Sequence, residues 1–110
     1  MSEPASISTG IAKRYATAVY DLAKETKAVK AIETDIAALQ DAMAESGDFN
    51  AMIHSPIYTR DQQGAAVTAL AKKMKLSGVM SNTLALMAQK RRLFVLPQLV
   101  QTLRDLIAED

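Results

Sequence analysis

The chain has 110 residues, which fits one domain of ordinary size built around a single hydrophobic core. Nearly half of the residues are apolar, and Ala, Leu and Met are far commoner than aromatic residues, a composition typical of packed helices. The formal net charge of +1 excludes a strong overall electric field that would attract nucleic acid or anionic lipid. The absence of cysteine excludes disulfide bonds and cysteine chemistry.

The first segment, residues 1–7, mixes Ser, Glu, Pro and Ala without periodicity, and we expect it to be a flexible tail. It lacks the basic flank and apolar core of a signal peptide, and no apolar run approaches the roughly 20 residues that span a bilayer. A first helix is predicted over about 8–26, with Ser8 or Thr9 as its amino-terminal cap. The chain is therefore expected to carry no export signal and to insert into no membrane directly.

A second helix is predicted over about 28–44, because apolar residues recur there at spacings of three and four. The pair Ser46-Gly47 is expected to end it, since glycine tolerates a positive φ. Asp48 can cap a short third helix, which Pro56 prevents from continuing. The buried stripe of the second helix is expected to be Val29, Ile32, Ile36, Leu39 and Met43.

A fourth helix follows a capping-box pattern, in which Thr59 precedes Gln62 by three residues. It is expected to end near Ser77-Gly78. Its inner face is predicted to contain Val67, Leu70, Ala71 and Met74.

The last two helices are predicted over about 78–91 and 94–108, the latter with Pro97 tolerated in its first turn. The expected buried stripe of the last one is Leu96, Leu99, Val100, Leu103, Leu106 and Ile107. No strand pattern and no internal repeat is detectable. The sequence therefore predicts an all-α fold, a single six-helix bundle over residues 8–108.

Two of these helices, the first and the fifth, have apolar faces that are wider than packing against one core requires. In each of them apolar and small residues cover about half of the helical wheel or more. One explanation is that both helices are central and buried on most sides. The other is that part of each face is free to bind a partner, and periodicity alone leaves both open.

Nothing in the sequence indicates catalysis, a metal ion or a cofactor. His54 is the only histidine, the four glycines are scattered, and no pair of acidic residues stands in an apolar setting. The basic run Lys90, Arg91 and Arg92 could contact phosphates, but no aromatic stacking partner lies beside it. A small helical nucleic-acid-binding module that uses this run, together with the cluster at 72, 73 and 75, is the alternative function.

Two motifs carry a resemblance to a known family. The segment NTLALMAQKRRLFVLPQL, residues 82–99, joins an apolar helix to a second helix through a basic hinge and a proline. The segment IAKRYATAVYDLA, residues 11–23, places a basic residue, Tyr-Ala and a second aromatic before Asp-Leu-Ala. Both resemble the amino-terminal domain of ATP synthase subunit delta, the bacterial and chloroplast counterpart of the mitochondrial oligomycin-sensitivity-conferring protein. The resemblance covers about residues 7–108.

The resemblance implies a six-helix bundle in which the first and fifth helices frame a groove for the amino-terminal amphipathic helix of an alpha subunit. Carried over by position, Tyr15 and Ala18 would line this groove from one side, and Asn82 and Leu86 from the other. The candidates of second rank beside them are Ile11, Leu22, Val79 and Thr83. Lys90 and Arg91 depart from the family, which more commonly has Asn and Gly in that turn.

The resemblance further implies a non-catalytic stator part of a rotary ATP synthase, peripheral on the cytoplasmic face of a bacterial inner membrane. In the family a carboxyl-terminal domain, absent here, reaches the b subunits of the peripheral stalk, so this chain is expected to be a truncated part or a stand-alone domain. We expect a monomer in isolation, no cofactor and no nucleic-acid partner. We also expect binding that changes little with salt, since an apolar groove has few charges.

Overall fold

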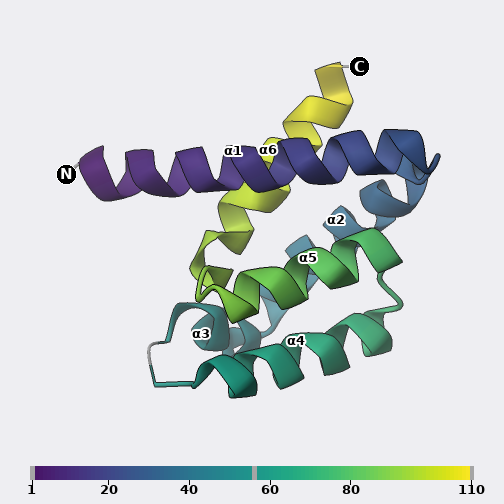
Figure 1. The fold of residues 1–110 in the computed structure, drawn as a ribbon. Helices are drawn as coiled ribbons and strands as arrows, with labels where there is room; N and C mark the ends of the chain where they lie inside the picture. Colours follow the sequence, from purple (N-terminus) through teal and green to yellow (C-terminus); the bar gives the residue numbers. More distant parts are fainter. Residues whose placement is uncertain (1, 56, 110) are drawn as a thin grey trace.

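The computed structural model describes residues 2–55 and 57–109, and within these ranges it contains helices and no strand (Figure 1). The predicted all-α fold of six helices is confirmed. The six α-helices are α1 (Ser2–Glu25), α2 (Val29–Glu45), α3 (Gly47–His54), α4 (Arg60–Met74), α5 (Gly78–Gln89) and α6 (Leu96–Glu109), and a short 3-10 helix, η1 (Leu93–Val95), joins the last two.

The arrangement of these helices is set by two close pairings. The most extensive contacts are those of α1 with α6, which cross, and of α4 with α5, which lie side by side (Figure 1). α5 also contacts α1 and runs beside it in the opposite chain direction. The middle of α1 therefore lies near the end of α5.

The core between α1 and α6 combines small residues with large ones. α1 buries mainly alanines at a spacing of three or four, and α6 faces them with leucines and a valine. Small side chains let two helix backbones come close, so the large side chains of α6 fill the remaining space. The buried residues are Ala12, Ala16, Val19 and Ala23 on α1, and Leu96, Leu99, Val100 and Leu103 on α6.

One or two residues past the end of three helices, a basic residue adopts the left-handed region: Lys27 after α1, Lys75 after α4 and Arg91 after α5, with φ of 56°, 57° and 60°. After each of them the chain donates a hydrogen bond back into the last helical turn, as where Arg92 N–H donates to Met87 O at 2.7 Å. This is the pattern that glycine usually supports at helix ends. Arg91 thus takes a left-handed conformation that glycine adopts more readily.

Both Ser-Gly pairs lie at helix starts. The second helix ends next to Ser46-Gly47 as predicted, but the predicted reason, a positive φ at Gly47, was wrong. None of the four glycines, all within the described residues, has a positive φ. Ser46 and Ser77 are instead the caps of α3 and α5, and Ser77 Oγ accepts from Met80 N–H at 3.2 Å. A serine hydroxyl satisfies a free amide at a helix start, and this determines how both pairs are used.

Other boundaries also differ from the prediction. α1 begins at Ser2, so neither Ser8 nor Thr9 caps it. The flexibility expected of residues 1–7 stays a prediction, and Met1 lies outside the described residues. Ser46, rather than Asp48, caps α3. Pro56, expected to limit that helix, lies outside the described residues.

The predicted capping box at the start of α4 is confirmed. Thr59 Oγ1 accepts from Gln62 N–H at 3.0 Å, and Gln62 Oε1 accepts from Thr59 N–H at 2.8 Å. Two amides at this helix start are thereby satisfied, which explains why the helix begins at Arg60.

Candidate functional site

A groove with a volume of about 310 Å³ opens between α1 and the end of α5. α1 contributes one side, and Leu86 with two cations of the following turn contributes the other. The antiparallel course of the two helices brings these distant segments together (Figure 1). The residues that line this α1–α5 groove are Ile11, Arg14, Tyr15, Ala18, Leu86, Lys90 and Arg92.

Three of the four residues predicted to bind the alpha-subunit helix line this one groove. Tyr15 and Ala18 come from α1 and Leu86 from α5. Ala18 is exposed, Tyr15 is partly buried, and the Leu86 side chain is 42% exposed. The fourth, Asn82, is exposed on α5 one helical turn before Leu86 and lies outside the groove lining.

The candidates of second rank divide in a similar way. Ile11 lines the α1–α5 groove. Leu22 lies one turn beyond Ala18 on α1, and its side chain is 46% exposed, so it extends the apolar surface along the helix. Val79 and Thr83 are partly buried in α5, and Thr83 Oγ1 donates to Val79 O at 2.8 Å, so this hydroxyl is engaged within its own helix.

The wide apolar face of α1 consists of two adjacent stripes with different partners. The inner stripe is buried in the core and comprises Ala12, Ala16, Val19 and Ala23. The outer stripe keeps some or most of its surface exposed and comprises Ile11, Tyr15, Ala18 and Leu22. On α5, likewise, Leu84 is 1% exposed whereas Leu86 is 42% exposed. Part of each wide apolar face is therefore buried in the core, and another part is exposed.

Three cations that the sequence-based site left out also line the groove: Arg14, Lys90 and Arg92. Arg14 could have been found from its position, because it lies one turn from both Ile11 and Ala18 on α1. Lys90 and Arg92 come to the groove because the chain turns back after α5. The groove is apolar along α1 and positively charged where α5 ends.

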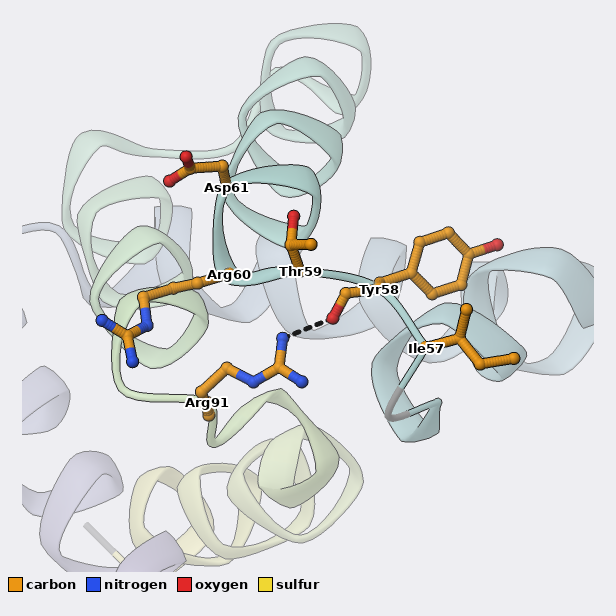
Figure 2. A pocket seen from close by; sticks show the side chains of 6 residues that line it. All are labelled: Ile57, Tyr58, Thr59, Arg60, Asp61 and Arg91. Carbon is orange, nitrogen blue, oxygen red and sulfur yellow. Dashed lines mark hydrogen bonds between the residues drawn. The ribbon is translucent and has the colours of Figure 1, made fainter.

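Arg91 points to a different side of the molecule from its two basic neighbours. Its Nη1 donates to the Tyr58 carbonyl oxygen, and also to Gln63 Oε1 at 3.4 Å. Figure 2 shows the guanidinium directed at the loop before α4, where Ile57 and Tyr58 point outward. The left-handed conformation of Arg91 separates the three consecutive cations. They therefore form no single basic patch.

The turn after α5 is held by a buried glutamine. Gln63 on α4 donates through Nε2 to Met52 O at 3.3 Å, so it connects α3 to α4 while it accepts from Arg91. A buried amide needs such partners, because an unsatisfied polar group is costly. This network fixes the turn that carries Lys90 and Arg92 to the groove.

The start of α5 is held by a buried carboxylate on α2. Asp35 is 3% exposed, and its oxygens accept from Ser77 N–H at 3.2 and 3.1 Å and from Ser77 Oγ–H at 2.5 Å. Hydrogen bonds to a charged acceptor are stronger than those between neutral groups. Asp35 thus fixes the cap of α5, and with it the direction in which α5 runs along α1. Sequence reasoning missed this residue.

The described residues show no arrangement suited to metal chemistry. Among 2–55 and 57–109 no three His, Asp or Glu side chains gather where they could hold a metal ion. His54 is exposed at the end of α3, and its Nδ1 lies 3.0 Å from Asn50 O within that helix. In the same ranges no helix combines the length and apolarity that crossing a membrane requires.

The chain is similar throughout to one group of proteins. The family described as ATP synthase delta (OSCP) subunit matches residues 11–110. The chain is 70% identical over 110 residues to ATP synthase subunit delta of Roseobacter denitrificans, and 59% identical to that of Fuscovulum blasticum, also over 110 residues. Each match covers the whole chain but only 59% of the relative, so the chain spans about three fifths of their length.

Proposed function

The chain belongs to the ATP synthase delta (OSCP) subunit family, and on that premise we propose that it is a non-catalytic stator part of the rotary F-type ATP synthase. Its α1–α5 groove binds the amino-terminal amphipathic helix of an alpha subunit. This contact holds the catalytic head against rotation during proton-driven ATP synthesis. The protein is a monomer by itself and lies peripherally on the cytoplasmic face of the inner membrane.

The observation that carries this proposal is that residues from α1 and α5 line one groove with an exposed apolar surface. Leu22 and Leu86 are both more than two fifths exposed, although the core takes up most other large apolar side chains. A contiguous exposed apolar surface beside a groove favours a site that another apolar stripe covers. An amphipathic helix supplies such a stripe at every third or fourth position.

The groove residues have distinct tasks in this proposal. Ala18, exposed and small, lets the backbone of the incoming helix approach α1 closely. Tyr15 offers a rigid aromatic surface with a polar tip, and Leu86 packs between side chains of the bound helix. Asn82, exposed one turn away from Leu86, contacts the helix farther along α5, beyond the lining of the groove.

The relatives are longer than this chain, and we assign contacts with the b subunits of the peripheral stalk to the part of them that it does not cover. The geometry disfavours the basic run at 90–92 as one nucleic-acid contact, because Arg91 is hydrogen-bonded to the loop before α4 while Lys90 and Arg92 line the groove.

The test is an NMR titration of the labelled chain with a synthetic peptide of about 20 residues, a length of roughly 30 Å as a helix, copied from the amino terminus of the cognate alpha subunit. We expect saturable shifts at Tyr15, Ala18 and Leu86, with Asn82 and Leu22 at the margin. Ala18→Gln places a long side chain in the groove and should weaken binding about tenfold or more, the loss expected when close packing at an interface centre is disturbed.

The matched control is Ala69→Gln, because Ala69 is also an exposed helical alanine but lies on α4, away from the groove. Both substitutions should leave the free energy of unfolding within about 0.5 kcal/mol of the original, as exposed substitutions usually do. Equal loss of binding in both variants, or no shifts at millimolar peptide, would contradict the proposed function.

A further inference from the structure

The α1–α5 groove and the stretch of α1 that continues it carry opposite charges at their two ends. Arg14, Lys90 and Arg92 line the end where α5 finishes. Farther along α1, on the same edge as Arg14, the exposed Asp21 and Glu25 follow at helical spacing. The outer apolar stripe of α1 therefore runs from a basic end to an acidic end.

Two other cations, Lys24 and Arg91, do not line the groove. Lys24, the cation in the last turn of α1, points away from the groove, since its Nζ lies 5.2 Å from the centre of the Tyr20 ring on another face of the helix. Arg91 donates a hydrogen bond to the Tyr58 carbonyl oxygen on the far side of the turn. The cations that line the groove are thus gathered at its basic end.

From this charge distribution we infer that the groove accepts the partner helix in one direction only. The partner carries Asp or Glu beside its apolar stripe at the end that lies over Arg14, Lys90 and Arg92. Its opposite end carries Lys or Arg over Asp21 and Glu25. This inference rests on the proposed function, and it adds the charge pattern and the direction of the bound helix.

The physical reason is that exposed ion pairs contribute little affinity but discriminate between orientations. Each such pair strengthens binding by only about 1.5- to 5-fold. In the reversed orientation both ends would bring like charges together, so the pairs that are gained in one direction become repulsions in the other. The apolar stripe thus supplies attraction, and the charged ends select the direction.

A consequence for salt follows, and it replaces the expectation from sequence that binding would be insensitive to salt. Exposed charges are screened over about 10 Å at 0.1 M salt and about 3 Å at 1 M salt. Peptide affinity should therefore fall as salt rises, while the apolar part of the interaction persists.

The test compares two double variants in the peptide titration. The first variant, Arg14→Gln with Lys90→Gln, removes two exposed cations of the basic end. The control, Lys72→Gln with Lys73→Gln, removes two exposed cations of α4 and makes the same change in net charge. At low salt the first variant should bind about 2- to 25-fold more weakly, two pairs at the factor above. It should also show a flatter salt dependence. The α4 variant should match the original protein in both respects.

A spin label on either end of the peptide tests the direction itself. A label at the acidic end of the peptide should broaden the amide signals around Lys90 and Arg92 of the protein. A label at the basic end of the peptide should broaden those around Leu22 and Glu25. The reverse pattern, equal broadening by both labels, or a cognate alpha helix without carboxylates at one end would overturn the inference.

The failure of this inference can be told apart from the failure of the proposed function. The peptide could give saturable shifts at Tyr15 and Leu86 with an affinity that changes neither with salt nor with the loss of Arg14 and Lys90. That result would support the helix-binding groove and contradict only the charge inference. An absence of any binding by the original protein would overturn the groove as an alpha-subunit site, and the direction with it.

Discussion

At the residue scale, single side chains at the ends of helices depart most from what sequence rules favour. Lys27, Lys75 and Arg91 all take a left-handed backbone conformation, in which the Cβ atom crowds the following carbonyl oxygen. Glycine avoids this crowding. The basic residues are tolerated because the hydrogen bonds of the turn are satisfied and because a cation near a helix carboxyl end interacts favourably with the exposed carbonyls.

Replacing Lys75 by glycine is therefore expected to stabilise the protein. The left-handed φ of 57° costs lysine about 1 to 2 kcal/mol, and the greater freedom of glycine in the unfolded chain offsets part of the gain. We expect a net increase of about 0.5 to 1 kcal/mol in the free energy of unfolding by urea denaturation. Lys72→Gly, one turn earlier within α4, is the control and should lose about 1 kcal/mol. A loss in both variants would contradict this account.

At the element scale, α5 is positioned by contacts at both of its ends rather than by its own sequence. Its start is held through the cap residue Ser77, which donates to the buried Asp35 of α2. Its end is held through Arg91, which donates to the loop before α4 and to Gln63. These two attachments set where Leu86 and the cations that follow it meet α1.

Asp35→Ala is expected to cost about 1.5 to 3 kcal/mol of unfolding free energy, the usual range for hydrogen bonds to a charged group, because Ser77 N–H and Oγ–H lose their acceptor. Urea denaturation measures this loss. Glu33→Ala, an exposed position on the same helix, is the control and should change stability by no more than about 0.5 kcal/mol. Equal effects at both positions would show that Asp35 has no anchoring role.

At the scale of the whole molecule, one continuous core connects every helix. The cluster of buried residues includes members of all six α-helices and of η1, with Ala16, Ile32, Phe49, Val67 and Leu84 among them. α1 takes part both in this core and in the groove, since its inner stripe packs on α6 while its outer stripe stays accessible. The groove thus lies on the surface of one continuously packed unit.

A shared core predicts that the molecule unfolds as one cooperative unit. Far-UV circular dichroism reports on all helices, whereas tyrosine fluorescence reports mainly on Tyr15 and Tyr20 of α1 and on Tyr58 before α4. In urea the two signals should give the same midpoint and the same slope. A lower midpoint for tyrosine fluorescence would mean that α1 detaches first and that the groove is lost before the remaining helices.

Local patterns in the sequence were sufficient for the helical content, the central members of the buried stripes and the cap formed by Thr59 and Gln62, because these depend on residues within a few positions of one another. The outer members of the predicted stripes are only partly buried: Val29, Met43, Leu70, Met74, Leu106 and Ile107. The resemblance to the delta family added Tyr15, Ala18 and Leu86, which the structure places in one groove. The width of the apolar face on α1 could be predicted from the sequence, but its division between core and groove could not.

The tertiary structure alone decided what depends on residues distant in the chain. Asp35 meets Ser77 across 42 positions and Arg91 meets Tyr58 across 33, and no periodicity carries such pairings. The left-handed turn at Arg91 splits the basic run, so Lys90 and Arg92 join Arg14 at the groove. Helical spacing determines which residues share a face, whereas the packing of neighbouring helices determines what that face meets.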